Sequence, residues 1–240
     1  SSLEGEGLTI NEFILLQARN SPAHFKLYRY LGQSEFKEVV VPRTSWALEP
    51  RNPQQIMALD LLLDPNVQLI SLVGPAGTGK TFLALLAGLQ QVVVQEQYRK
   101  MLISRPVIPL GPDIGYLPGT IQEKLHSWMQ PMYDNMDFIT HAANASRKAM
   151  HYDQERIVKK HKHDKHNNKL DQHDERFKKN FLGSLDQLIG DGKVSLEAIT
   201  YMRGRSIPFQ YILIDEAQNL TPHEVKTIIS RAGEGTKVIL

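Results

Sequence analysis

The sequence contains no cysteine, which excludes a disulfide framework and any metal site built on thiolates. No stretch approaches the roughly 18 consecutive apolar residues of a membrane-spanning helix, and no signal-peptide pattern is visible. Net charge is also small, because 28 basic residues face 26 acidic ones, so total charge favours no class of partner. We therefore expect a cytoplasmic protein of ordinary globular composition with no membrane partner.

Residues 74–81 match the pattern G-x-x-x-x-G-K-[ST] over its full length. The matching residues are Gly74, Pro75, Ala76, Gly77, Thr78, Gly79, Lys80 and Thr81. An apolar run at 67–73 predicts a buried strand before the motif, and residues 81–90 predict a helix after it. Strand, glycine-rich loop and helix in this order are the context of a phosphate site, which makes a chance glycine turn a poor alternative.

The chemistry of this loop predicts a nucleoside triphosphate as its ligand. Glycines let backbone N–H groups close around a phosphate, and the N-terminus of the helix adds its dipole. Lys80 would reach the β- and γ-phosphates, and the Thr81 hydroxyl would ligate Mg²⁺.

A second candidate element of the site is the acidic pair Asp215 and Glu216, which follows the apolar strand predicted at 211–214. A carboxylate at the carboxyl end of a strand lies on the edge where α/β folds bind ligands. With a P-loop upstream, Asp215 would hold Mg²⁺ and Glu216 would position the attacking water. The alternative is an acidic pair that only caps the next helix.

The chain divides by composition into two parts, 1–50 and 51–240. The first part predicts a small β-rich element, with strand-like runs at 12–16, 25–30 and 36–41. In the second part helices and strands alternate, which predicts an α/β fold with a parallel sheet. Helices are expected at 53–63, 121–136, 181–189 and 222–231, and strands at 101–104, 194–199 and 211–215. The strand-like ending at 237–240 suggests that further sequence follows.

The run at 25–30 alternates aromatic and basic side chains. They are Phe25, Lys26, Tyr28, Arg29 and Tyr30. On one sheet face they could stack bases and contact phosphates. The alternative is an ordinary small sheet with a half-buried face.

Residues 144–180 form a basic insert, with eleven Lys and Arg against six Asp and Glu, and five of the nine histidines. Apolar residues are sparse, so the segment should be exposed. RNA contact is an open alternative, and so is metal binding by the histidines. The histidines concerned are His161, His163, His166 and His173.

The string at 215–218 resembles the D-E-x-Q motif of superfamily 1 helicases, in which the glutamine senses the γ-phosphate; here that residue is Gln218. Residues 52–58 resemble the N-x-x-Q-x-x-A segment of the same superfamily. The resemblance implies that Gln55 reads the adenine edge and favours ATP over GTP.

Several motifs in one order resemble the PhoH family of ATPases, and more loosely its branch in which a PIN ribonuclease domain comes first. They lie at 74–81, 104–106, 115–119, 201–205 and 214–219. The resemblance implies a RecA-like P-loop fold, ATP hydrolysis, RNA unwinding linked to RNA cleavage, and a hexameric ring. The long insert and the absence of the family's T-G-D continuation depart from it. No PIN carboxylate cluster is visible, so we expect this chain to carry the ATPase part.

Four arginines are candidates for contact with RNA or with a neighbouring subunit's nucleotide. They are Arg105, Arg203, Arg205 and Arg231. For Arg203 and Arg205 the alternative is a structural pairing with carboxylates, and for Arg231 an interaction with the helix dipole.

Taken together, these patterns predict an Mg-ATP-hydrolysing motor that acts on RNA as a homo-oligomer. Two rival functions stay open: ATP-driven remodelling of protein substrates, and a nucleotide-gated RNA-binding module without motor activity.

Overall fold

The computed structural model describes residues 7–18, 21–45, 48–106, 128–142, 185–197 and 206–240, and shows an α/β fold. Its centre is a five-stranded sheet with the order β4-β8-β7-β5-β6, all parallel. The strands are β4 (Leu69–Ile70), β5 (Lys100–Ser104), β6 (Val194–Leu196), β7 (Gln210–Ile214) and β8 (Lys237–Ile239). The predicted fold class, a P-loop parallel sheet preceded by a small β-rich element, is confirmed.

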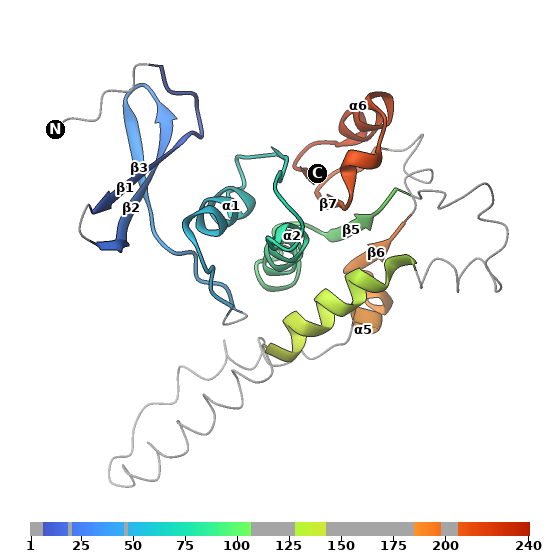
Figure 1. The fold of residues 1–240 in the computed structure, drawn as a ribbon. Coiled ribbons are helices and arrows are strands. Elements are labelled where there is room, and N and C mark those ends of the chain that lie inside the picture. Colours follow the sequence, from blue (N-terminus) through green and yellow to red (C-terminus); the bar gives the residue numbers. More distant parts are fainter. Residues whose placement is uncertain (1–6, 19–20, 46–47, 107–127, 143–184, 198–205) are drawn as a thin grey trace, which may run out of the picture.

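Helices cover both faces of this sheet (Figure 1). They are α1 (Pro53–Leu63), α2 (Lys80–Leu89), the helix at 128–142, α5 (Leu185–Gly190) and α6 (Pro222–Arg231). Because successive side chains of a strand point to opposite faces, Met101 and Ile103 join one core cluster and Leu102 joins another. The first cluster lies under α1, α2, α5 and the helix at 128–142, and the second lies under α6.

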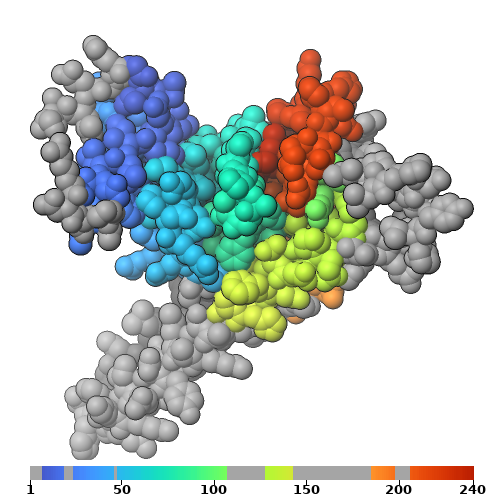
Figure 2. Space-filling view, viewed as in Figure 1, coloured from blue at the N-terminus to red at the C-terminus, as the bar shows by residue number. Residues whose placement is uncertain are grey.

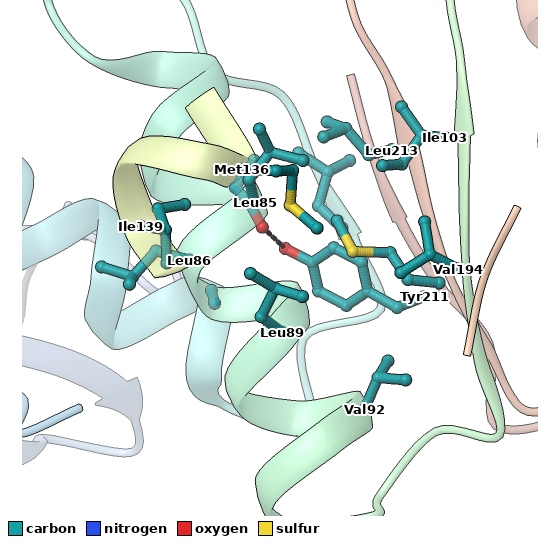
Figure 3. Packing of buried hydrophobic residues seen from close by; sticks show 14 of the residues in the cluster. Leu85, Leu86, Leu89, Val92, Ile103, Met136, Ile139, Val194, Tyr211 and Leu213 are labelled. Carbon is teal, nitrogen blue, oxygen red and sulfur yellow. Dashed lines mark hydrogen bonds between the residues drawn. The ribbon is translucent and has the colours of Figure 1, made fainter. Parts of the chain in front are cut away.

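The larger core is closely packed around Tyr211 (Figure 3). The Tyr211 hydroxyl donates a hydrogen bond of 2.8 Å to the carbonyl oxygen of Ala84, so its one polar group is satisfied inside the core. A Cβ atom at Gly88 would lie 2.7 Å from both Met101 Cε and Tyr211 Cε1. Glycine at this position lets α2, the helix that follows the P-loop, lie close against the sheet.

The N-terminal element is a separate antiparallel sheet with the order β1-β2-β3. Its strands are β1 (Phe13–Ala18), β2 (Ser21–Gly32) and β3 (Glu35–Val39). Gln33 and Ser34 turn the second hairpin with φ of 51° and 62°, the left-handed backbone that tight hairpins require. One face packs on α1 through Leu27, Val39 and Ile56. In the space-filling view this sheet (blue) and α6 (red) lie on opposite sides of the molecule (Figure 2).

The structure favours the alternative, an ordinary small sheet with a half-buried face, over a nucleic-acid face at Phe25 to Tyr30, because Tyr30 is 8% exposed and two more of these side chains are covered. Arg29 is 2% exposed and is enclosed by carboxylates, and Phe25 packs with the cluster against α1. Tyr28 lies on the outer face of β2, and Lys26 is exposed beside it in an ion pair with Glu38. A strand alternates its faces, so residues with odd and even numbers cannot share one surface.

Several predicted boundaries shift. The strand predicted at 67–73 is confined to β4, although backbone hydrogen bonds to β8 and Leu240 extend from Gln68 to Leu72. The helix predicted at 81–90 begins at Lys80 and continues as a π-helical turn, Gln90–Val94. Of the helix predicted at 121–136, residues 128–136 are helical and the helix continues to residue 142, while residues 121–127 lie outside the described residues. The insert at 144–180, with its histidines, lies outside the described residues, as do residues 107–127 and Arg203 and Arg205.

Candidate nucleotide site

The P-loop and the end of β7 meet at the carboxyl edge of the parallel sheet. The strand leading to the loop and the strand ending before Asp215 are separated only by β8. Gly77 and Gly79 have φ of 76° and 88°, a left-handed backbone that glycine adopts without strain. The bends at these two glycines lead the chain into α2, whose first residue is Lys80. The loop thus leads directly to a helix N-terminus, as anion binding requires.

The Lys80 ammonium lies over the loop itself. Its Nζ donates hydrogen bonds to the carbonyl oxygens of Gly74 at 2.8 Å and Pro75 at 2.9 Å. The Thr78 hydroxyl donates to the Pro75 carbonyl at 2.9 Å. The loop residues 74–78 are exposed. An entering phosphate would therefore displace water from the loop and replace these carbonyl oxygens as the partner of Lys80.

Thr81 and Asp215 are 134 residues apart in sequence but in direct contact. The Thr81 hydroxyl donates a hydrogen bond of 2.7 Å to Asp215 Oδ1. The backbone supports this placement, because Asp215 N donates to the Ser104 carbonyl at 2.9 Å, which ties the end of β7 to β5. The two residues predicted to bind the metal ion are therefore brought together.

Glu216 stands directly beside them, at a turn with φ of 54° that leads into the short helix Ala217–Asn219. Gln218 Nε2 donates a hydrogen bond to Glu216 Oε2. On the other side, Arg105 Nη2 lies 3.7 Å from Glu216 Oε1, and Arg105 Nε lies 3.8 Å from Asp215 Oδ2. From the sequence, Arg105 was predicted only to contact RNA or a neighbouring subunit's nucleotide. Its position between the Asp215 and Glu216 carboxylates was not predicted.

Gln55 also reaches the P-loop, from the first turn of α1. Its Nε2 donates to the Thr78 carbonyl at 3.2 Å, and its Oε1 accepts from the Arg51 N–H at 2.8 Å. Asn52 caps the helix by accepting from the Gln55 N–H, which fixes the start of α1 beside the loop. The residue predicted to read adenine is thus adjacent to the phosphate loop.

Sequence reasoning also missed a buried charged network at the other end of α1. Arg29 donates to Asp60 at 2.9 Å and to Asn11 at 2.7 and 2.9 Å, and its Nη2 lies 2.8 Å from Asp64. Lys37 donates to Asp60 at 2.8 Å. A signal was present in the sequence: acidic residues sit at the C-terminal end of an otherwise apolar helix, where the helix dipole disfavours them unless they are paired.

Lys237 completes this end of α1. It is fully buried, and its ammonium donates to the carbonyl oxygens of Leu61, Leu62 and Asp64 at 3.2, 2.7 and 2.7 Å. Burial lowers the pKa of Lys237 to about 8, and the neighbouring Asp64 opposes that shift. Leu61 and Leu62 lie in the last turn of α1 and Asp64 is its C-cap, so the ammonium supplies donors where the helix runs out of N–H groups. Both ends of α1 are therefore fixed, one at the P-loop and one in this network.

The last described arginine candidate is Arg231, the C-terminal residue of α6. It is exposed, and its backbone carbonyl accepts a hydrogen bond from Ile207 N at 3.0 Å. It lies outside the group formed by Thr81, Asp215 and Glu216.

The residues at the sheet edge fit a hard divalent cation such as Mg²⁺. Magnesium is bound by one or two carboxylates together with waters and substrate phosphates, and it prefers oxygen ligands. Thr81 and Asp215 supply such oxygens next to the loop. The described part of the chain contains no group of three or more His, Cys, Asp or Glu side chains that could hold a metal ion.

The chain is similar to known proteins over most of its length. The family described as PhoH-like protein matches residues 47–240. The chain belongs to the PhoH family. A protein of Bacillus subtilis (strain 168) named Protein PhoH2 is 44% identical over 196 residues, covering 81% of this chain and 36% of the relative. Protein PhoH2 of Mycolicibacterium smegmatis is 31% identical over 241 aligned residues, covering 95% of this chain and 46% of the relative.

A PhoH-like protein of Synechocystis sp. (strain ATCC 27184 / PCC 6803 / Kazusa) is 30% identical over 169 residues, with 70% of this chain and 39% of that protein aligned. The chain thus spans less than half the length of these three PhoH relatives. The family consists of P-loop NTPases, so this PhoH protein has a nucleotide-binding fold. In the described part of the chain, no helix has the length and apolar character needed to cross a membrane.

Proposed function

We propose that this PhoH protein binds Mg-ATP, hydrolyses it, and uses the energy to unwind RNA or to move along it. The observation that carries the first part is the 2.7 Å contact between the Thr81 hydroxyl and Asp215. That contact joins the P-loop to an acidic strand end, which is the arrangement that phosphoryl transfer needs.

Each residue has a role in this proposal. Backbone N–H groups of 74–81 hold the phosphates, and Lys80 leaves the Gly74 and Pro75 carbonyls to neutralise them. Magnesium, held by Thr81 and Asp215, supplies charge neutralisation at the phosphates when it is bound. Glu216, oriented by Gln218, places a water molecule in line with the γ-phosphorus. The water oxygen forms a bond to phosphorus, the bond to the bridging oxygen breaks, and ADP, phosphate and a proton are released.

RNA as the substrate is proposed from the resemblance of the sequence motifs at 74–81, 104–106 and 214–219. A single lobe cannot both close over the γ-phosphate and move along a strand, so a homo-oligomer, such as a six-membered ring, is part of the proposal. The residues proposed to act on RNA or across the subunit interface are Arg105, Arg203, Arg205 and Arg231. The rivals remain remodelling of protein substrates and a nucleotide-gated RNA-binding module.

Phosphate release from ATP tests the proposal, measured with and without single-stranded RNA and with an unfolded protein as a competing stimulant. We expect Mg-dependent turnover that RNA increases and the protein does not. Lys80→Ala should lower turnover by about 10²–10³-fold, because it removes the charge on the transferred phosphate. Lys226→Ala is the matched control, since Lys226 is exposed on α6 away from the loop. Equal turnover in parent and Lys80→Ala would refute hydrolysis at this site, and stimulation by protein alone would favour the first rival.

A further inference from the structure

One guanidinium group spans both carboxylates of the candidate site. Arg105 is the residue directly after β5, and its side chain is 23% exposed, against 10% for Asp215 and 39% for Glu216. Nε faces Asp215 Oδ2 and Nη2 faces Glu216 Oε1. Because Oδ1 of Asp215 already accepts from Thr81, the aspartate has a neighbour on each of its oxygens.

The distances show what kind of contact this is. At 3.8 and 3.7 Å, the Arg105 nitrogens are close enough for ion pairing but too far for hydrogen bonds. Charge holds the group in place without the two parallel hydrogen bonds that make an Arg–carboxylate pair strong and specific. Another cation can therefore displace Arg105 from a carboxylate that it contacts in this way.

A divalent ion at Thr81 and Asp215 would be such a cation. It needs the Thr81 oxygen and the negative charge of Asp215, both of which the present contacts engage. The positive charge of Arg105 beside Asp215 also repels an entering metal ion. Removal of that charge should therefore strengthen metal binding.

We propose that Arg105 is a charge-balancing residue that competes with the divalent cation for Asp215, and so sets the metal affinity of the nucleotide site. The proposal rests on the proposed function, since it concerns the same Mg-nucleotide site. When metal and nucleotide enter, Arg105 gives up Asp215 and keeps Glu216 as its remaining partner. Arg105 acts through these carboxylates and is a positioning residue.

Mn²⁺ is a suitable probe because its free-ion signal in electron paramagnetic resonance reports binding without any turnover. The parent protein, saturated with ADP, is titrated with Mn²⁺ and compared with Arg105→Gln, Arg105→Lys and Arg99→Gln, each corrected for Mn²⁺ held by ADP alone. Arg99→Gln is the matched control: it removes the same charge just before β5, at the opposite end of the strand, where Arg99 lies 5.1 Å from the Phe209 ring.

The expected result is Mn²⁺ affinity on the order of tenfold tighter in Arg105→Gln than in the parent. Arg105→Lys keeps the charge and should stay close to the parent, and so should Arg99→Gln. Parent-like or weaker Mn²⁺ binding in Arg105→Gln would overturn the inference while leaving the proposed function intact. Tighter Mn²⁺ binding in Arg105→Lys or in Arg99→Gln would also overturn the inference, because the charge at residue 105 would then not be what limits metal affinity. A parent protein that binds no Mn²⁺ with ADP would refute the proposed function as well.

Discussion

The protein holds two groups of charged residues, at opposite ends of α1, and they differ in how completely the charges are paired. At the C-terminal end, the side chain of Arg29 is 3% exposed and makes contacts of 2.7–2.9 Å with Asn11, Asp60 and Asp64. At the sheet edge beyond the N-terminal end, Arg105 is 23% exposed and lies 3.7–3.8 Å from its carboxylates. Burial and complete pairing indicate that the first network is structural, and loose pairing at a partly exposed edge is what we expect of the proposed nucleotide site.

Because of this difference, substitutions at the two ends of α1 should alter different properties of the protein. Breaking a buried pair leaves an uncompensated charge inside the protein and costs stability. Ion pairs that are partly open to water and too long for hydrogen bonds contribute little to stability, so changes at the sheet edge should appear in binding and turnover. Four predictions separate the two ends.

Glu216→Gln should produce the largest effect, and only on turnover. The amide keeps the size of the side chain and its neighbour Gln218 but loses the charge that orients water. We expect ATP hydrolysis to fall by about 10²–10⁴-fold, with Mg-ATP affinity and unfolding free energy close to those of the parent. Single-turnover phosphate release, together with nucleotide titration, measures both. Unchanged hydrolysis would show that another group orients the water.

Arg29→Met should instead reduce stability. It leaves Asp60 and Asp64 in place, 8% and 17% exposed, without their main partner. The free energy of unfolding should fall by about 3–5 kcal/mol in denaturant titration. Arg105→Gln is the matched comparison at the sheet edge and should cost less than about 1 kcal/mol. Similar losses in the two variants would remove the distinction between the networks.

Lys237 gives the buried end a pH dependence. Its pKa is about 8 in the folded protein and 10.5 in the unfolded chain, so between these values the unfolded state binds more protons. Stability should therefore rise with pH, by about 1–2 kcal/mol between pH 8 and pH 9.5. The range stops short of pH 10 because burial raises the pKa of Tyr98 to about 12, which reverses the slope there. Unfolding titrations across this range should show the rise in the parent and not in Lys237→Met. The same rise in both proteins would assign it to other groups.

Gln55→Ala should have the smallest effect of the four, a reduced preference for ATP over GTP. It tests whether the N-terminal end of α1 takes part in nucleotide binding. Gln55 contacts the P-loop at Thr78, and the helicase resemblance assigns it the adenine edge. We expect the preference for ATP over GTP to fall by about five- to tenfold, the value of one or two hydrogen bonds to the base. Competition titrations with both nucleotides measure the ratio, and Gln54→Ala on the exposed side of the helix is the control. A parent protein with equal affinity for ATP and GTP would contradict the assignment.

The sequence predicted the parts of the fold that depend on local pattern. Short apolar runs predicted β5 and β7, and α6 begins at Pro222 as predicted, where the structure shows that Thr221 and Glu224 form a capping box. The short β4 was harder to predict, because the pairing of an edge strand depends on its neighbour β8 and on its own apolar run together.

The candidate site was predictable wherever a motif fixes the backbone. Lys80, Thr81 and Asp215 were found because loop, helix start and strand end each have a local signature. The role of Arg105 was not predictable, since which carboxylate it faces depends on the pairing of β5 with β7. Arg29 was misplaced for a similar reason, because its partners Asp60 and Asp64 come from a helix outside the sheet.

Metal-dependent nucleotide binding tests the central claim most directly, namely that Thr81 and Asp215 form one Mg-nucleotide site with the P-loop. The measurement is the affinity for a fluorescent ATP analogue in Mg²⁺ and in EDTA, for the parent and for Asp215→Ala, with Asp191→Ala as control for loss of an exposed acid. We predict that Mg²⁺ strengthens binding to the parent and to the control by about tenfold or more, and that Asp215→Ala loses this gain. Equal strengthening by Mg²⁺ in Asp215→Ala would contradict the account.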